Sequence, residues 1–370
     1  MNRPVESEQA GRIRGVAERL RAAGLDLLVV GPSSDFYYLT GLVGLPSERL
    51  KVLLVSSQGE SAMVLPAFEA SLVDHLPVRP ALYPWEETQD PLVGLQRAVR
   101  DLGSARRVAV GPQLWGVFLL RIQQALSESG FVDGGPLLAE LRMRKSPSEL
   151  ELMRTAGRIA DQAYLQVIAQ PVASRTEREV LGMIHDALRR GGLDRLGGGI
   201  VGAGANGASP HYKTADRRIA AGDAIVIDYG GQYRSYWCDI TRTPHAGPPS
   251  DEFRRVYRIV QEAQQAAFES VRPGVTCESI DRVARDYITR HGFGEHFLHR
   301  TGHGIGLDGH EEPYLVAGNA LPVEEGMTFS IEPGIYLPGR FGVRIEDIVV
   351  VTRNGADRLN SSTRDIAIVS

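Results

Sequence analysis

The sequence predicts an α/β domain at the N-terminus followed by a larger α+β domain. The chain has 370 residues, of which 43% are hydrophobic, and a chain longer than about 300 residues usually divides into separate cores. Helical and strand patterns alternate over residues 1–133, whereas two similar helix-helix-strand units follow one another over residues 140–370. The turn-forming run Asp133 to Pro136 is the predicted linker.

The N-terminal domain is predicted to open with a helix, because Ile13, Val16 and Leu20 recur at helical spacing before Gly24. Residues 35–41 are interpreted as a short aromatic turn. Apolar runs bounded by turn residues predict strands at 25–31, 51–57, 61–66 and 107–110 and helices at 91–101 and 113–129. This domain carries little chemistry of its own, so we expect it to serve packing and oligomerisation.

The C-terminal domain begins with a helix start signal. Ser146 at the N-cap, Pro147 at the first helical position and Glu149 two residues later form a capping box, and Thr176 with Glu179 repeats it. The pattern predicts helices at 147–170, 176–191, 250–271 and 276–291 and strands at 198–203, 225–242, 301–306, 327–336 and 342–352. Because this arrangement occurs twice, we expect a pseudo-symmetric domain with a site between two sheets.

The stretch 225–242 is predicted to be a β-hairpin that turns at residues 230–232. Each arm carries one acid, Asp228 and Asp239, among apolar neighbours. An acid in such a place must be protonated, paired or bound to a cation, because desolvating a bare charge costs several kcal/mol. The two acids therefore indicate a metal site, and strand-end acids that face water are the alternative for this pair alone.

Three more residues in the second half occupy unusual positions. His303 lies between glycines, and Glu332 and Glu346 each interrupt an apolar run predicted to be a strand. The four carboxylates carry four negative charges, which two divalent cations would balance. Oxygen-rich ligands with a single histidine favour Mn²⁺, with Co²⁺, Fe²⁺ and Zn²⁺ as alternatives.

These five residues, in this order, resemble the ligands of the pita-bread metallopeptidases, a group that includes methionine aminopeptidase, aminopeptidase P, prolidase and the metal-free creatinase. The resemblance covers about residues 140–370 and implies a pita-bread catalytic domain that binds two divalent metal ions. The implied metal ligands are Asp228, Asp239, His303, Glu332 and Glu346. The earlier run Tyr38 to Gly41 is similar to the N-terminal domain of the creatinase, prolidase and aminopeptidase P branch, which implies cleavage before proline.

The resemblance also implies roles in hydrolysis by a water that two cations activate. Asp239 and Glu346 are expected to bridge both ions, and Glu332 to take the proton of the attacking water. The histidines that match the two catalytic histidines of the family are His211, expected to contact the substrate near the scissile bond, and His310, expected to hydrogen-bond the tetrahedral oxyanion.

Two arginines are candidates for substrate or ligand contacts. Arg344, two residues before Glu346 on the same strand face, is expected to orient a ligand carboxylate, with a structural ion pair as the alternative. A dipeptidase also needs a cation for the free carboxylate beyond proline. Arg49, in the polar turn 46–49, is the candidate, acting on a neighbouring subunit in the homodimer usual for the branch, and a solvated loop arginine is its alternative.

The function that these observations favour is an Xaa-Pro dipeptidase, or prolidase, acting on proline-containing peptides. An aminopeptidase P acting on longer peptides remains an alternative. A metal-free hydrolase of the creatinase type and a peptide-binding module are further alternatives, and the complete ligand set disfavours both.

Composition and charge exclude other classes of function. The formal net charge is -4 and there is no basic stripe for nucleic acid, no apolar run long enough to span a membrane and no signal-peptide core. Two cysteines, Cys238 and Cys277, fit a cytoplasmic protein better than a disulfide framework. The G-x-G-x-x-G pattern at 202–207 is followed by no helical periodicity, so we reject a dinucleotide site. His299 is among the histidines that we place on the surface.

Overall fold

The structure is a computed structural model that describes residues 7–370. Contacts within the chain divide it into two compact units, with the boundary along the chain between Arg142 and Met143. The segment expected to be a linker lies inside the first unit, where it forms the end of β6 (Gly130–Asp133) and the start of α5 (Gly135–Arg142). Within the described residues, no helix is both long and apolar enough to cross a bilayer.

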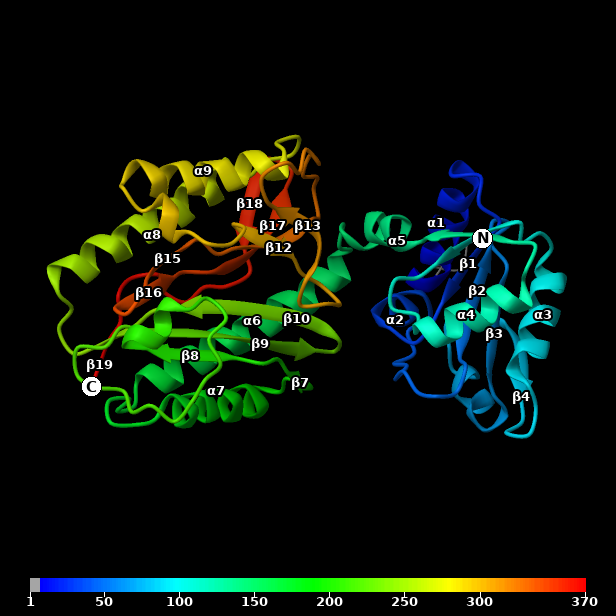
Figure 1. Cartoon of the computed structure of the whole chain (residues 1–370), viewed down its shortest axis with the longest axis horizontal. Coiled ribbons are helices and arrows are strands. Elements are labelled where there is room, and N and C mark those ends of the chain that lie inside the picture. Colours follow the sequence, from blue (N-terminus) through cyan, green and yellow to red (C-terminus); the bar gives the residue numbers. More distant parts are fainter. Residues whose placement is uncertain (1–6) are drawn as a thin grey trace, which may run out of the picture. The chain divides into compact units, whose positions relative to one another are not determined.

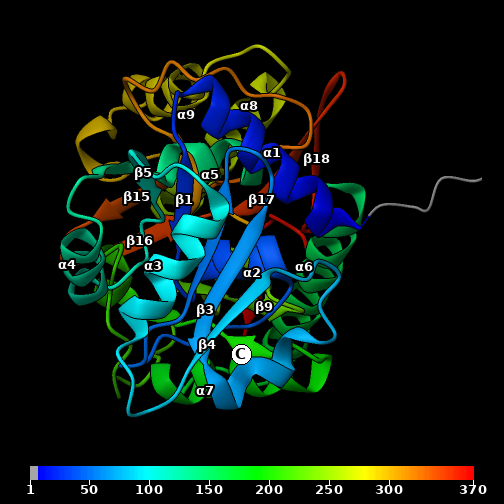
Figure 2. The same cartoon turned by 90° about the vertical axis from the view of Figure 1, so that its right-hand side faces the viewer.

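The N-terminal unit is built on a six-stranded mixed sheet in the order β4-β3-β2-β1-β5-β6. Its strands are β1 (Leu27–Val30), β2 (Val52–Ser56), β3 (Ser61–Pro66), β4 (Ala81–Trp85), β5 (Arg107–Val110) and β6. Its α-helices are α1 (Glu8–Ala22), α2 (Ser34–Thr40), α3 (Pro91–Leu102), α4 (Gly116–Ala125) and α5. The central strands β1 and β2 are buried along their whole length, as expected where helices cover both faces of a sheet, whereas the edge strands β4 and β6 are largely exposed (Figures 1 and 2).

The aromatic segment interpreted as a turn is in fact the helix α2. Ser33 is its N-cap and accepts a hydrogen bond from the backbone N–H of Phe36, and Gly41 ends it in the left-handed conformation, with φ of 78°. Phe36 and Leu39 are fully buried. Packing of these apolar residues stabilises a short helix whose own propensity is weak.

The first half of the C-terminal unit places two helices on one hairpin-centred sheet. The elements are α6 (Pro147–Ile168), α7 (Glu177–Gly191), β7 (Arg195–Leu196), β8 (Ile200–Ala203), β9 (Ile225–Tyr233), β10 (Tyr236–Arg242) and β11 (His245–Ala246). Both predicted capping boxes are present, at Ser146 and at Thr176. The glycines at 202–207 lead from β8 into a short 3₁₀ helix, Gly204–Ala208, rather than into the α-helix that a dinucleotide fingerprint would open.

The second half repeats this arrangement with its own helix pair. The elements are α8 (Asp251–Ser270), α9 (Cys277–Arg290), β12 (Gly302–Gly304), β13 (Glu311–Leu315), β14 (Thr328–Ile331), β15 (Gly334–Leu337), β16 (Phe341–Arg344), β17 (Asp347–Thr352), β18 (Gly355–Arg358) and β19 (Ile368–Val369). Five strands form a sheet in the order β13-β12-β14-β17-β18, and β15 pairs with β16. Figure 1 shows the strands of both halves between α6 and α7 (green) and α8 and α9 (yellow).

Candidate metal centre

One cavity of about 400 Å³ in the C-terminal unit collects most of the predicted site residues. Its lining includes His211, Asp228, Asp239, His303, His310, Glu332, Arg344 and Glu346, together with Pro210, His299 and Arg300. Arg49 belongs to the N-terminal unit, where it is paired with the acids Glu48 and Glu87 and its side chain is 37% exposed. Residues as far apart in the chain as Pro210 and Glu346 thus meet in one place in the C-terminal unit.

The hairpin β9–β10 presents both aspartates on one face. Asp228 pairs across the strands with Thr241, and Asp239 pairs with Gly230, so the two acids are diagonal neighbours on the same side. The turn lies at Arg234 and Ser235, both with positive φ, and the predicted turn at residues 230–232 was wrong. A Cβ on Gly230 would lie 2.2 Å from the carbonyl oxygen of Cys238, so glycine is required inside the strand rather than at its turn.

His303 on β12 is held in one tautomer. Its backbone N–H donates to Ser330 Oγ at 3.0 Å, and its Nδ1 lies 3.0 Å from the carbonyl oxygen of Gly304. Because a carbonyl can only accept, Nδ1 carries the hydrogen and Nε2 presents its lone pair. That Nε2 lies 3.3 Å from Glu332 Oε1, which also accepts from Ser330 Oγ at 3.0 Å. The arrangement leaves Nε2 as a ligand atom directed at the acids.

Glu332 and Glu346 do not lie inside strands as predicted, but at strand breaks. Glu332 follows the last residue of β14, and Glu346 lies between β16 and β17. A break frees the backbone from the strict alternation of side chains and allows the carboxylate to turn toward the cavity. Thr241 Oγ1 donates to Glu346 Oε2 at 2.7 Å. One donor atom each of Asp239, His303 and Glu346 lies within 4.8 Å of the others.

The electrostatics of the cavity fit a bound cation. Burial, and then the charges of Asp228 and Glu332, raise the pKa of Asp239 well above its ordinary value. Burial, followed by the charge of Asp239, does the same to the pKa of Glu346. Burial also raises the pKa of Glu332 and lowers that of His303 to about 4. Four carboxylates and a neutral imidazole with a free lone pair are donors that suit divalent cations.

Arg344 is the buried cation that contacts these acids. Its Nη2 donates to Asp228 Oδ2 at 2.5 Å, its Nε donates to Thr241 Oγ1 at 3.2 Å, and its Nη1 donates to the hydroxyl of Tyr336 at 2.7 Å. The side chain is only 3% exposed. These contacts fix the position of the Asp228 carboxylate, while one positive charge leaves most of the negative charge of the four acids uncompensated.

His310 is oriented by a neighbouring arginine. Arg300 Nη2 lies 3.1 Å from His310 Nδ1, and because a guanidinium only donates, Nδ1 must accept. Burial, His303 and Arg300 lower the pKa of His310 to about 4, so the ring is neutral at pH 7 and carries its hydrogen on Nε2. Its ring stacks on His303 with centroids 3.8 Å apart. His310 therefore offers a hydrogen-bond donor beside the candidate ligands.

His299 is a cavity residue that the sequence analysis wrongly placed on the surface. Its Nδ1 contacts the carbonyl oxygen of Arg300 at 2.8 Å, which leaves Nε2 to accept from the hydroxyl of Tyr336 at 2.8 Å. Tyr336 also accepts from Arg344, so hydrogen bonds connect His299 to Asp228 through two residues. No local pattern marks His299, because it lies in a loop before β12 and its partner Tyr336 is 37 residues away in the chain.

Metal removal is expected to make the stability of the protein fall as pH rises above about 6.5. Asp239, Glu332 and Glu346 have raised pKa values, so the metal-free native state holds protons that the unfolded state has released. His303 and His310 act in the opposite direction, but only below their unfolded value of 6.5. The melting temperature of metal-stripped protein should therefore decrease as the pH rises above 6.5.

The control for this prediction is the Glu346→Gln variant, which removes one of the raised groups. Its melting temperature should fall less over the same range, and excess Mn²⁺ should flatten the wild-type profile. An unchanged or rising melting temperature of the metal-free wild type would contradict the electrostatic description of the cavity.

Comparison with known families matches both units. Residues 151–353 match metallopeptidase family M24, and residues 12–144 match the creatinase/prolidase N-terminal domain. The first match contains all five candidate metal ligands and both candidate catalytic histidines.

Individual relatives and solved structures extend over nearly the whole chain. A probable dipeptidase PepE of Mycobacterium tuberculosis is 40% identical over 366 residues, which cover 97% of this chain and 96% of the relative. An Xaa-Pro dipeptidase of Pyrococcus horikoshii is 30% identical over 360 residues, covering 96% and 98%. The crystal structure of dipeptidase PepE from Mycobacterium ulcerans superposes with a TM-score of 0.93, at 40% identity and with 100% of both chains covered.

Proposed function

The chain belongs to metallopeptidase family M24, with a creatinase-type N-terminal domain and a pita-bread catalytic domain, and we propose that it hydrolyses Xaa-Pro dipeptides. Family membership implies divalent metal ions. The observation that carries the proposal is the convergence of four acids and the Nε2 of His303 in one cavity that also holds three further histidines, His211, His299 and His310. The names of the relatives, dipeptidase and Xaa-Pro dipeptidase, support the choice of substrate.

The proposed metal centre holds two ions, with Mn²⁺ the favoured metal. Asp239 and Glu346 would bridge the ions, Asp228 would complete one, and His303 with Glu332 would complete the other. The bound ions supply Lewis-acid activation of water and of the scissile carbonyl. Four carboxylates, with two of them shared, balance two divalent charges, which supports two ions rather than one.

The residues of the chain supply the remaining steps. Glu332 accepts the proton of the attacking water, and its carboxylate is held for this by Ser330. His310 donates from Nε2 to the oxyanion of the tetrahedral intermediate, in the tautomer that Arg300 imposes. His211 contacts the substrate beside the scissile bond. Arg344 fixes Asp228 and thereby the geometry of its oxygens.

The proposal includes a homodimer in the cytoplasm. Trp115, at the N-cap of α4, and Val117 and Leu120, on α4, are exposed apolar side chains that support an oligomeric contact in the N-terminal unit. Both cysteines of the chain are buried and unpaired, which supports a reducing compartment. Arg49 of the second subunit is proposed to hold the free carboxylate of the dipeptide, although within its own chain it pairs with two acids.

The function is tested by comparing an Xaa-Pro dipeptide with the same peptide extended by one residue. We expect metal-stripped protein given back Mn²⁺ to hydrolyse the dipeptide with a kcat/KM at least about tenfold higher than that for the extended peptide. The reason is that a site for the carboxylate of the dipeptide adds roughly 1.4 kcal/mol or more of binding free energy. A dipeptide without proline serves as the control. Faster cleavage of the longer peptide would identify an aminopeptidase instead. If neither peptide is cleaved, the peptidase proposal is wrong.

A further inference from the structure

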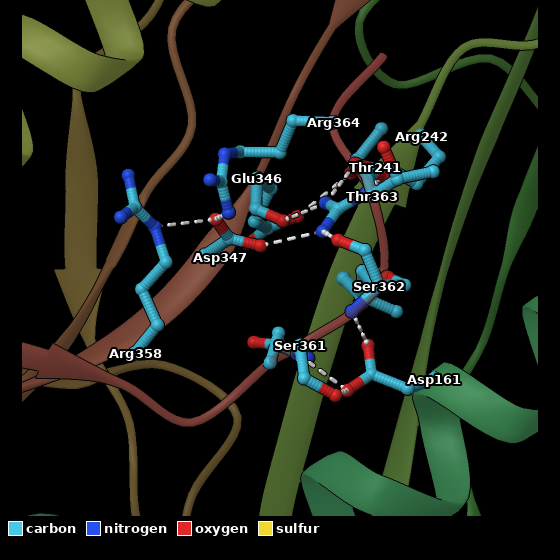
Figure 3. A network of polar contacts seen from close by, with 12 residues as sticks. Asp161, Thr241, Arg242, Glu346, Asp347, Arg358, Ser361, Ser362, Thr363 and Arg364 are labelled. Carbon is cyan, nitrogen blue, oxygen red and sulfur yellow. Dashed lines mark hydrogen bonds and ion pairs between the residues drawn. The ribbon is translucent and has the colours of Figure 1, made fainter. Parts of the chain in front are cut away.

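Arg242, the last residue of β10, lies behind the metal cavity and is fully buried. Strand alternation separates its side chain from those of Asp239, which lines the cavity, and Thr241, which contacts Glu346. Figure 3 shows its guanidinium close to Asp347, with Arg358 and Arg364 on the other sides of that carboxylate. The proposed hydrolysis gives this buried cluster no role.

Each of the five N–H groups of the Arg242 guanidinium has an acceptor. Nη1 donates to the carbonyl oxygens of Glu346 at 2.5 Å and Thr241 at 3.0 Å. Nη2 donates to Asp347 Oδ1 at 2.6 Å. The remaining bonds go to the carbonyl oxygens of Ser362, from Nη2, and Thr363, from Nε. One side chain thus joins β10, the residue Glu346 and the C-terminal loop (Figure 3).

The backbone at Glu346 needs such support because it lies outside the regular pairing of the strands. β16 ends at Arg344 and β17 begins at Asp347, so no strand ladder continues through Glu346. Its N–H donates to the carbonyl oxygen of Thr241 at 3.1 Å, and its carbonyl oxygen accepts from Arg242. Both polar groups of this residue are therefore held by β10, the strand that carries Asp239.

Asp347 anchors the arginine in turn. Its carboxylate is inaccessible to solvent and also accepts from Arg358 at 3.0 Å, Arg364 at 3.3 Å and Gln264 at 3.2 Å. The carboxylate of Glu346 lines the cavity, whereas that of the next residue, Asp347, contacts the arginines. A displacement of Asp347 therefore moves the backbone of Glu346, because one peptide bond joins the two residues.

We infer that Arg242, anchored by Asp347, is a positioning residue of the metal centre: it fixes the backbone of Glu346 relative to Asp239, so that their carboxylates reach the same ions. The inference rests on the proposed metal-binding function. Arg242 touches neither the substrate nor the ions. Its effect is expected in metal affinity and in kcat rather than in KM, because the substrate contacts lie elsewhere in the cavity.

The test compares Arg242→Met and Arg242→Lys with the matched control Arg358→Met. All three weaken the pairing with Asp347, but only Arg242 reaches the carbonyl oxygen of Glu346. Metal-stripped full-length proteins are titrated with Co²⁺, followed by visible absorption and calorimetry. We expect Arg242→Met to bind the more weakly held ion about 10- to 100-fold less tightly, as for other residues that support metal ligands.

The Arg358→Met protein should keep Co²⁺ affinity within about twofold of the wild type while its melting temperature falls. The Arg242→Lys variant keeps the charge but cannot donate all five hydrogen bonds, so its Co²⁺ affinity should lie between those of Arg242→Met and the wild type. It takes the place of Arg242→Met in the test if that variant fails to fold. Wild-type affinity and spectrum in a folded Arg242 variant, or equal losses in Arg358→Met, would overturn the inference. Failure of the wild type itself to bind Co²⁺ would remove the proposed metal centre as well.

Discussion

The Asp239→Asn variant is expected to lose at least about 1000-fold in kcat/KM for an Xaa-Pro dipeptide, equivalent to roughly 4 kcal/mol. Asp239 supplies one of three donor atoms that lie within 4.8 Å of one another, and it is the proposed bridge between the two ions. An amide has one good donor oxygen and no charge, so it cannot serve two cations. The measurement is the initial rate at saturating Mn²⁺, with bound metal determined on the same sample.

The control for this variant is the stability of the metal-free protein. Because burial and then the neighbouring acids raise the pKa of Asp239, its charge is destabilising without a cation, and removing it should leave the melting temperature unchanged or higher. Asp357→Asn, on the exposed edge of β18, is a matched change outside the cavity and should leave the rate unaltered. Full turnover of Asp239→Asn would exclude the residue as a ligand.

The parts of the fold that the sequence predicted correctly are those encoded by local signals. The capping boxes at Ser146 and Thr176 identified the starts of α6 and α7 because their side chains satisfy the first backbone N–H groups of the helix. Acids in apolar runs were recognisable as anomalies because burial of a charge is costly wherever it occurs.

The features that were missed depend on contacts between distant segments. Gly230 resembles a turn residue in sequence, and only its close approach to Cys238 across the hairpin shows why glycine stands there. His299 follows a polar loop, and its place in the cavity depends on the hydroxyl of Tyr336, which is 37 residues away in the chain. Arg242 has the sequence context of a strand end, and its acceptors come from three separate segments.

The strand breaks at the candidate ligands also explain why their residue types were easier to single out than their geometry. A carboxylate within an apolar run is visible in the sequence, but whether the strand continues through it is decided by pairing with another segment. At Glu346 that segment is β10, from the other half of the unit. The choice of candidate ligands therefore rests on local signals, and their relative positions depend on contacts across the whole C-terminal unit.

Replacing His310 by alanine is expected to lower kcat by about 100- to 1000-fold with little change in KM, as for the loss of one donor to an oxyanion. The reason is that the oxyanion exists only after the attack, so a donor directed at it stabilises the transition state more than the bound substrate. Arg300 and burial keep the ring neutral with its hydrogen on Nε2, which prepares the donor before the substrate arrives.

The measurement for His310→Ala is steady-state kinetics on an Xaa-Pro dipeptide at saturating Mn²⁺, with Co²⁺ affinity determined separately. Metal affinity should stay within about threefold of the wild type, because His310 stacks on His303 without being a proposed ligand. His310→Gln retains a side-chain N–H donor and should recover part of the rate, whereas His75→Ala, at an exposed position of the N-terminal unit, should change nothing. If His310→Ala instead raised KM with kcat intact, the residue would contact the ground-state substrate. The oxyanion would then need another donor, for which His211 lines the same cavity.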